Sequence, residues 1–345
     1  MPWLEILLLK SLLALKGSLR VQSRSRQFAS LGDTLNNLVI NTTGSTQRDV
    51  RQRTAAIVTT ADAAVHAHIS AALGRVGLAN ATNLAGFSPS QLPHPSLARF
   101  AVLGRASVWA DASAKATYFN ATSAIYLLVP PAAQRASPLP LQPLRRRGTG
   151  HSESEIPGLV GALSELRSAV VKRLSEGLNM SLVSTAALTP LDLDGPRCIH
   201  QRKQCYGNNN DANYLQSSTG YLEEDAAAVL VGSSCVENRK CTYTNIGLYH
   251  AHPTTATNTS VDHRRFAGSA ASYAPSLPAG LADRAFAYTI ARDCRAIGPF
   301  CVELPRSAQE WSLIYRTYLE PATRTGPALD ELIIPQILRF RRRSW

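Results

Sequence analysis

The chain has 345 residues, enough for one large domain or two smaller ones. Hydrophobic residues make up 45% of it and charged residues 17%, which excludes the composition of an intrinsically disordered protein. The net charge is +12, of which residues 1–150 supply +11 with 16 Lys and Arg against 5 Asp and Glu. This basic half predicts a polyanion-binding surface, an arginine-rich targeting leader or a solvated arm.

Residues 1–50 read as a leader or a basic disordered arm. An apolar stretch from Leu4 to Leu15 is interrupted by Lys10 and is shorter than the roughly 20 residues that a bilayer requires. It fits a degenerate secretory signal, part of a leader for another organelle, or an amphipathic helix. Since no other segment reaches membrane-spanning length, we expect no transmembrane span.

Residues 51–130 are expected to hold an N-terminal helix followed by a β segment. The alanine-rich run over residues 51–73 predicts the helix. Two β segments are expected over residues 106–131, the second containing the apolar run Ile125–Val129. Residues 131–155, rich in proline and arginine, predict a linker or exposed loop in which Arg145, Arg146 and Arg147 are candidate polyanion contacts.

Residues 156–345 are expected to form a disulfide-containing α+β domain. A helix over Pro157–Lys172 is predicted by an apolar stripe at helical spacing, made by Leu159, Leu163, Leu166, Val170 and Leu174. A strand over residues 180–188 follows, and a second helix is expected over Ala308–Leu319. The predicted fold class is α+β, a largely antiparallel β-sheet core with flanking helices and disulfide-pinned hairpins.

Two segments, Ala226–Ser233 and Cys241–His250, predict adjacent strands with a cysteine at each edge of their connection. In the second segment Tyr243, Asn245, Gly247 and Tyr249 are expected to share one face. Residues 285–294 and 301–305 are expected to form a further crosslinked pair, with a helix as the alternative for the first segment. Residues 331–340 end the fold, with Pro335 marking an edge strand or a break.

All six cysteines lie between positions 198 and 301, in couples six or seven residues apart. We expect three local disulfides, which persist only in oxidising compartments. Reduced thiols or a metal site are the alternatives, although no C-x-x-C spacing favours zinc. The expected bridges join Cys198 to Cys205, Cys235 to Cys241, and Cys294 to Cys301.

Five N-x-Ser/Thr triplets are candidate glycosylation sites. They begin at Asn41, Asn80, Asn120, Asn179 and Asn258. Together with the cysteine couples they favour a secreted or secretory-lumenal protein; an organelle reached through an N-terminal leader is the alternative.

Asn209, Asp211 and Asn213 alternate like the first ligands of a calcium loop, but the glycine and glutamate of an EF-hand are missing. A plain turn, a sugar-contacting loop and a loose calcium site stay open. His250 and His252 lie two apart at a strand end, and with His263 they are candidate zinc ligands. No cofactor follows from the sequence.

For an enzyme, the candidate catalytic residues are Asp211, Asn213, Tyr243, His250 and His252. No G-x-S-x-G elbow, nucleotide-binding glycine motif or nucleic-acid recognition motif is present, so nucleic acid is not an expected partner. Three interpretations remain: a secreted or lumenal glycoprotein with a binding or structural role that contacts glycans or other polyanions; a secretory-pathway hydrolase or lyase; and a zinc- or calcium-binding protein. We favour the first because it requires the fewest special arrangements.

Overall fold

The computed structural model describes residues 7–8, 33–43, 54–91, 113, 116, 120, 124–129, 136–191, 201, 209–251 and 255–343. The chain divides into two compact units. Unit 1 comprises residues 1–32, 40–142 and 195–206, and unit 2 comprises residues 33–39, 143–194 and 207–345. Each unit is described by itself below.

The described part of unit 1 centres on a strand–helix–strand motif. Strand β2 (Ala56–Thr60) leads into helix α1 (Ala63–Arg75), and β3 (Thr82–Gly86) returns parallel to β2. Asp62 caps the helix by accepting a hydrogen bond from the Val65 amide at 2.9 Å. The remaining elements are the turns η2 (Ala79–Ala81) and η3 (Pro89–Gln91) and the two-residue strands β1 (Leu7–Leu8) and β4 (Tyr126–Leu127), which pair with each other.

The helix predicted over residues 51–73 is only partly correct. Its second half lies in α1, whereas residues 56–60 form strand β2. The run Ile57-Val58-Thr59-Thr60 is β-branched throughout, and such side chains favour strands over helices. Asp62 then marks the true start of the helix. Most of the β segments predicted over residues 106–131 lie outside the described residues.

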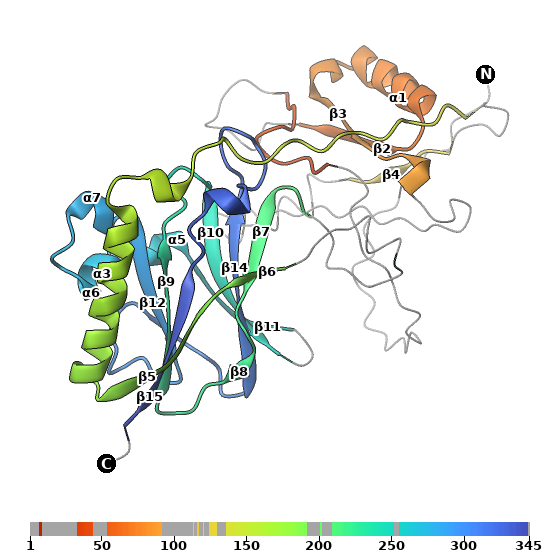
Figure 1. Ribbon diagram of the computed structural model, residues 1–345. Helices are drawn as coiled ribbons and strands as arrows, with labels where there is room; N and C mark the ends of the chain where they lie inside the picture. Colours follow the sequence, from red (N-terminus) through yellow and green to blue (C-terminus); the bar gives the residue numbers. More distant parts are fainter. Residues whose placement is uncertain are drawn as a thin grey trace. The chain divides into compact units, whose positions relative to one another are not determined.

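Unit 2 contains a five-stranded sheet in which all neighbours are antiparallel except β12 and β13. The last strand of the described chain, β15, lies inside this sheet with β9 on one side and β5 on the other (Figure 1). In spatial order the strands are β13 (Cys301–Glu303), β12 (Ala285–Ala291), β9 (Ala226–Ser233), β15 (Gln336–Arg342) and β5 (Met180–Ala187).

A second sheet of six strands is antiparallel throughout. Its central strand β14 pairs with β10 on one side and with β7 and β8 on the other. The strands are β11 (Thr255–Asp262), β10 (Tyr243–His250), β14 (Glu310–Tyr318), β7 (Ala212–Gln216) and β6 (Thr189–Pro190), with β8 (Gly220–Tyr221) beside β14.

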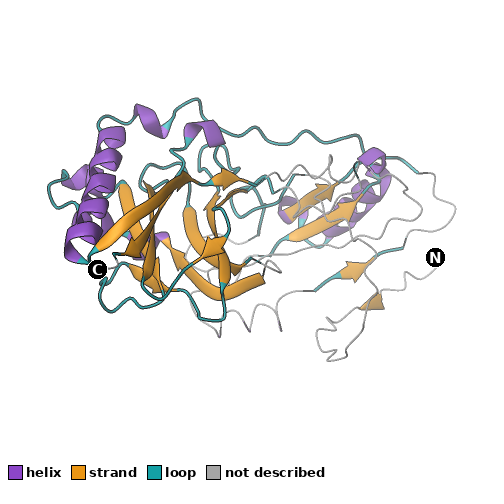
Figure 2. Cartoon of the chain, turned by 60° about the horizontal axis from the view of Figure 1, so that its bottom comes forward, coloured by secondary structure: helices purple, strands orange, loops and turns teal. Residues whose placement is uncertain are grey.

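The two sheets and one long helix form three layers with two cores. Helix α3 (Leu159–Lys172), continued by the π-helical turn η7 (Arg173–Gly177), covers one face of the five-stranded sheet (Figures 1 and 2). The opposite face of that sheet packs against the six-stranded sheet through Trp311, Tyr315, Phe286 and Tyr288. Shorter elements are η6 (Glu153–Glu155), α5 (His263–Phe266), α6 (Ser269–Tyr273), α7 (Ala279–Ala282) and η8 (Leu329–Glu331).

The apolar stripe predicted for α3 is confirmed. All five of its members are buried, with exposed fractions between 0% and 5%, and they pack in the core between the helix and the sheet. The predicted strands over residues 180–188 and 226–233 are present as β5 and β9. Strand β9 is buried on both faces, as its continuous apolar run indicates.

The helix predicted over Ala308–Leu319 is wrong, because residues 310–318 form the central strand β14. Trp311, Leu313 and Tyr315 alternate toward the core between the sheets. Residues 312, 314, 316 and 318 lie on the opposite face. Buried side chains therefore recur every two residues along β14 rather than every 3.6. Pairing with strands on both sides overrides the helix propensity of the segment.

The segment between β9 and β10 connects two sheets rather than two strands of one hairpin. The disulfide Cys235–Cys241 closes this turn with a Cα–Cα distance of 5.3 Å, but β9 belongs to the five-stranded sheet and β10 to the six-stranded one. A second disulfide, Cys294–Cys301, closes the connection between β12 and β13 with a Cα–Cα distance of 5.6 Å. Cys198 and Cys205 lie outside the described residues.

The fold class predicted from the sequence is confirmed: the chain is α+β, its sheets are mostly antiparallel, and two disulfides lie in its C-terminal half. Among the residues that the structure describes, no helix has both the length and the apolar character needed to cross a bilayer.

Candidate functional site

One face of the six-stranded sheet gathers aromatic side chains around an arginine. Side chains alternate along β10, so Ile246 and Leu248 enter the core while Tyr243 and Tyr249 lie on the opposite, outer face. Strands β14 and β7 add the remaining members. We call this set the tyrosine–arginine face; it comprises Tyr214, Tyr243, Tyr249, Arg316 and Tyr318.

The strand register places four of these five side chains in two neighbouring rows, while Tyr249, which is paired with Ser312, lies further along β10. Asp262, Asn245, Arg316 and Tyr214 are directly paired across four strands and form a polar row. Tyr243 and Tyr318 form the next row, with their ring centroids 5.8 Å apart. The face therefore presents a line of hydrogen-bonding groups beside a pair of aromatic rings.

Arg316 lies at the centre of this face between two tyrosine rings. Its guanidinium carbon is 5.4 Å from the ring centroid of Tyr249 and 5.6 Å from that of Tyr214. These are distances at which a cation is attracted to an aromatic ring. Arg316 also donates hydrogen bonds to the Tyr249 hydroxyl and, at 3.5 Å, to the Asn245 side-chain oxygen.

Gly247 makes room for this arrangement. A β-carbon at Gly247 would stand 2.9 Å from the Nη1 atom of Arg316 and 3.0 Å from the ring of Tyr249. Any larger residue would push one of these side chains out of place. The glycine of β10 thus allows the guanidinium of β14 to lie across its neighbouring strand.

The edge of the face at β11 carries a histidine and a paired carboxylate. The ring of His263 meets the ring of Tyr243 edge-on at 5.6 Å, and burial raises the pKa of the Tyr243 hydroxyl. Partial burial opposes ionisation of Asp262, but the hydrogen bonds from Arg264 outweigh it and hold the pKa of that carboxyl below its ordinary value. Asp262 is therefore a neutralised anion at this edge.

Known proteins offer little guidance to this site. No family model and no curated protein matches the chain. Among solved structures, the VPA0106 protein from Vibrio parahaemolyticus is similar with 15% identity and a TM-score of 0.26. The match covers 57% of this chain and 47% of that protein, so this chain spans less than half of its length.

The predicted catalytic residues are distributed over several places. Tyr243 belongs to the tyrosine–arginine face, whereas His250 stands seven residues further along β10, at the opposite end of the strand. Asn213 is buried on the core side of β7, where it donates to the Pro327 carbonyl at 2.7 Å. Asp211 precedes that strand and accepts a hydrogen bond from Asn36 at 2.6 Å. His252 lies outside the described residues.

The predicted metal ligands do not gather in the described part of the chain. His263 contacts Tyr243, near the start of β10, and His250 is at the end of the same strand. Over the described residues, no group of three His, Cys, Asp or Glu side chains is arranged to hold a metal ion. With His252 outside them, the zinc interpretation stays a prediction.

The Asn/Asp loop before β7 anchors other segments of unit 2. Asn209 accepts the Asp211 amide at 2.9 Å, which is an Asx turn, and Asn210 donates to Asp33 at 3.0 Å. Arg147 donates to Asn213 at 2.5 Å and to the carbonyl of Asn209 at 2.8 Å. These contacts join the loop to other segments of unit 2, and its three interpretations stay predictions.

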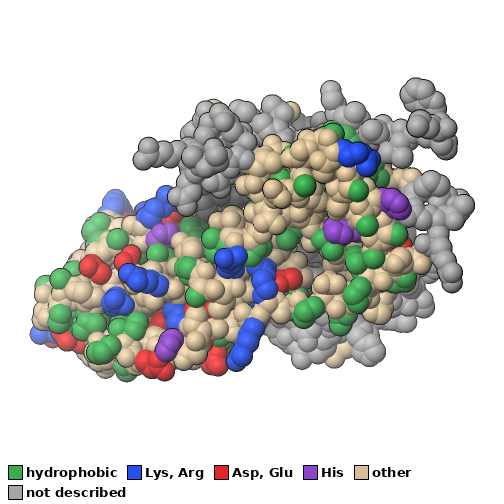
Figure 3. Space-filling view, turned by 90° about the horizontal axis from the view of Figure 1, so that it is seen from above, with side chains coloured by type: hydrophobic (Ala, Val, Ile, Leu, Met, Phe, Trp, Pro, Cys, Tyr) green, Lys and Arg blue, Asp and Glu red, His purple; other side chains and the backbone are tan. Residues whose placement is uncertain are grey.

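Two of the three candidate polyanion contacts are engaged within unit 2. Arg145 pairs with Asp33 at 2.7 Å and also donates to the Thr34 carbonyl. Burial lowers the pKa of Arg147, whose N–H groups bond the Asn/Asp loop. Arg146 is exposed. In the view of Figure 3, basic and acidic side chains are interspersed over the part that holds α3 and the two large sheets.

A second polar cluster of unit 2 lies at one end of the sandwich, around Lys240. This side chain is 6% exposed, and its ammonium group donates to Thr149 at 2.8 Å, Glu320 at 3.0 Å and Glu331 at 2.6 Å. Burial alone would raise the pKa of Glu331, but the bonds from Lys240 and from the amides of residues 149 and 150 lower it to about 2. All three donors of the lysine are thus satisfied.

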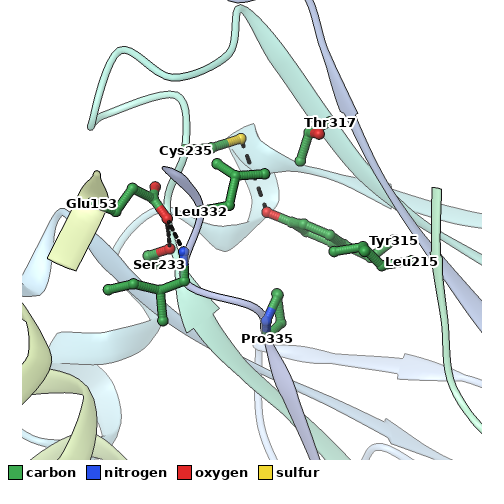
Figure 4. Close-up of a pocket in the computed structure, with 9 residues that line it drawn as sticks. Glu153, Leu215, Ser233, Cys235, Tyr315, Thr317, Leu332 and Pro335 are labelled. Carbon is green, nitrogen blue, oxygen red and sulfur yellow. Dashed lines mark hydrogen bonds between the residues drawn. The ribbon is translucent and has the colours of Figure 1, made fainter. Parts of the chain in front are cut away.

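Glu153 lines a small closed pocket next to this cluster (Figure 4). Its carboxylate accepts hydrogen bonds from the Ser233 hydroxyl at 2.6 Å, the Asn238 amide at 2.8 Å and the backbone N–H of Ile333 at 2.8 Å. Burial raises its pKa. Across the pocket the hydroxyl of Tyr315 points at the sulfur of Cys235, 4.0 Å away. The carboxylate of Glu153 thus connects the segments that hold Ser233, Asn238 and Ile333.

Arg316, Tyr318 and Tyr214 were not among the predicted site residues. Arg316 and Tyr318 could have been found from the two-residue alternation of residues 310–318, but that segment was predicted to be a helix. The shared face of Tyr243, Asn245, Gly247 and Tyr249 was predicted, and its partners become visible only when β10 is paired with β14.

Proposed function

We propose that this protein is a secreted or lumenal glycan-binding glycoprotein and that the tyrosine–arginine face holds the saccharide. The proposal is carried by one observation: Tyr243, Tyr249 and Arg316 lie half-buried on one sheet face, in and beside the polar row through Asn245. Tyrosine and arginine are the side chains that recognition surfaces favour.

The chemistry of the face suits a sugar. A saccharide presents apolar C–H faces that pack on aromatic rings, and hydroxyl groups that need donors and acceptors at their rim. The rings of Tyr243 and Tyr249 offer apolar surface with a polar tip, while Asn245 and Arg316 supply an amide and a charged donor. Because the rings are partly buried on one sheet, we expect little side-chain entropy to be lost on binding.

The disulfides and the sequons support the proposed compartment. Bridges such as Cys235–Cys241 and Cys294–Cys301 persist in oxidising surroundings and are rare in the cytosol. Of the sequon asparagines, Asn41, Asn80 and Asn120 are exposed, as attachment of a glycan requires.

The experiment is a binding screen of the full chain on an array of oligosaccharides, followed by titration calorimetry of the best ligand. Tyr243→Ala and Tyr249→Ala are each expected to weaken binding about tenfold, the loss that follows from roughly 1.4 kcal/mol. Tyr221→Ala is the matched control, because Tyr221 is 70% exposed on β8 and does not belong to the face.

Two results would contradict the proposal. One is a correctly folded full chain that binds no saccharide on the array. The other is equal weakening by Tyr221→Ala and Tyr249→Ala, since binding would then not depend on the tyrosine–arginine face. Near-UV circular dichroism of each variant checks that the fold is intact.

A further inference from the structure

The guanidinium of Arg316 approaches two aromatic rings, those of Tyr214 and Tyr249, whereas the guanidinium groups of Arg173 and Arg339 each approach one. Arg145, Arg264, Arg295, Arg306 and Arg341 each pair with a carboxylate. Arg292 donates four hydrogen bonds to backbone carbonyls. Arg316, like Arg173, Arg284 and Arg339, has no carboxylate partner among the described residues. Its side chain donates to one phenol and one amide oxygen.

The guanidinium of Arg316 has more N–H donors than these two contacts use. A guanidinium carries five N–H groups, and the bonds to Tyr249 and Asn245 use two of them. The bond to Asn245, at 3.5 Å, is at the limit of a hydrogen bond. The side chain of Arg316 is only partly buried, and we expect its remaining donors to be open to a ligand.

The surroundings of Arg316 do not neutralise its charge. In its row, Asp262 is the carboxylate, and Arg264 already pairs with that group. Asn245 stands between the two strands that carry Asp262 and Arg316 and is uncharged. The row therefore holds one uncompensated positive charge, set between aromatic rings.

We infer that Arg316 binds the carboxylate of an acidic saccharide, a uronic or sialic acid residue, at the tyrosine–arginine face. This inference rests on the proposed glycan binding and names its substrate class. The planar fork of arginine matches the two oxygens of a carboxylate. The rings of Tyr249 and Tyr214 flank the guanidinium, and successive sugar rings of the ligand pack on Tyr249 and on Tyr243, which lie six residues apart on β10.

The test compares acidic sugars with their neutral counterparts on the full chain. The probes are cellobiuronic acid against cellobiose and sialyllactose against lactose, titrated by calorimetry. The protein is expected to bind one acidic probe about tenfold more tightly than its neutral partner, as one charge-assisted pair provides. The pair that shows this preference identifies a uronic or a sialic acid.

Variants of Arg316 then assign the preference to this side chain. Arg316→Gln is expected to remove the preference for the acid, so that the acidic and the neutral sugar of a pair bind with affinities within about twofold of each other. Arg316→Lys keeps the charge but lacks the fork, so it is expected to lose most of the preference as well. Arg306→Gln is the control, because Arg306 is 84% exposed and pairs with Glu224 away from the face.

The outcomes are separable. If neutral and acidic sugars bind equally, or if Arg316→Gln keeps the preference, the inference fails while glycan binding stands. If Arg316→Lys keeps the full preference, the assignment to the arginine fork is overturned. If no sugar binds, the proposed function fails with it. The saccharide assignment would also be overturned if a single-stranded ten-nucleotide DNA bound more tightly than every sugar and Arg316→Gln abolished that binding.

Discussion

Glu153 is 1% exposed, yet its hydrogen-bond donors are all neutral groups. Three donors stabilise the charged carboxylate, but burial disfavours it more strongly, so the pKa lies above its ordinary value of 4.5. Glu331 is 8% exposed but is bonded to Lys240, and its pKa is shifted the opposite way, to about 2. Two neighbouring carboxyl groups therefore titrate in different ranges.

The pH dependence of stability follows from these directions. Between pH 4.5 and the raised pKa of Glu153 the folded chain binds a proton that the unfolded chain does not, so stability falls as pH rises through this window. We expect Glu153→Gln to reduce that fall. Urea unfolding at pH 5 and pH 7 measures it, with the exposed Glu155→Gln as control for the loss of one negative charge.

A Glu153→Gln protein whose stability falls between pH 5 and pH 7 as steeply as that of the wild type would contradict this assignment. Glu331 acts at lower pH. Its contribution is present above pH 4.5 and is lost as the pH falls toward 2, so it does not interfere with the comparison.

Lys240 is the cation that compensates two buried carboxylates. Lys240→Met would leave Glu320 and Glu331 buried without their cation, at 1% and 8% exposure. Breaking a buried pair in this way costs about 3–5 kcal/mol of the free energy of unfolding. Denaturant titration at pH 7 measures it, and Lys172→Met at an exposed position of α3 is the control. A loss below about 1 kcal/mol would show that water reaches the carboxylates.

The sequence could indicate which residues of β10 share a face, because alternation along one strand is a local property. It could not indicate Arg316 as a member. That membership depends on the pairing of Asn245 with Arg316, residues 71 positions apart. For the same reason Arg145 and Arg147 appeared as free positive charges, whereas the fold brings Asp33 and the Asn/Asp loop to them.

Among the elements, α3 and β14 show where local pattern succeeds and fails. The stripe of α3 has one apolar face at a clear helical period, and that face decides its packing. Strand β14 has apolar residues on both faces, including Ile314 at 7% exposure, so its period is blurred and Glu310 and Leu313 suggest a helix. The two strands that flank β14 decide its conformation.

The two disulfides permit a prediction at the scale of elements. Each closes a short loop, with sequence separations of 6 and 7, for which chain entropy gives about 2 kcal/mol. The double variant Cys235→Ala with Cys241→Ala is expected to lower the free energy of unfolding by more than this. Both side chains are 2% exposed and pack near Leu332. Cys294→Ala with Cys301→Ala is expected to stay near the entropic value.

Chemical denaturation of the two double variants, each compared with the unmodified chain under oxidising conditions, measures these losses. The interpretation fails if the second pair costs more than the first, since the surrounding core would then not contribute. Addition of dithiothreitol to the wild type should lower its stability by no less than the larger of the two losses.

For the molecule as a whole, the cores of the two units differ in extent. The described part of unit 1 buries Val58, Ala81 and Leu139 among its apolar residues, while unit 2 contains both large clusters. Larger cores bury more surface per residue and are more stable. Division into two units was open to prediction from length alone, but their boundaries were not, because each unit is assembled from separate stretches of chain.

We therefore expect two unfolding transitions, with unit 1 unfolding at the lower denaturant concentration. Leu166→Ala, at a fully buried position of α3, should shift only the second transition, by about 2–5 kcal/mol. Hydrogen exchange with peptide resolution assigns each transition to its unit, and Val160→Ala, at 56% exposure, is the control. A single transition that moves as a whole in Leu166→Ala would argue against independent units.

The position of β15 has a consequence for how this protein is made. A nascent chain that has emerged only as far as β14 possesses β9 and β5 but not the strand that belongs between them. Their facing edges then have unsatisfied amides and carbonyls, which invite pairing with a foreign strand. Synthesis of residues 336–342 closes that gap, so the interval before it is when the newly made polypeptide most needs a chaperone.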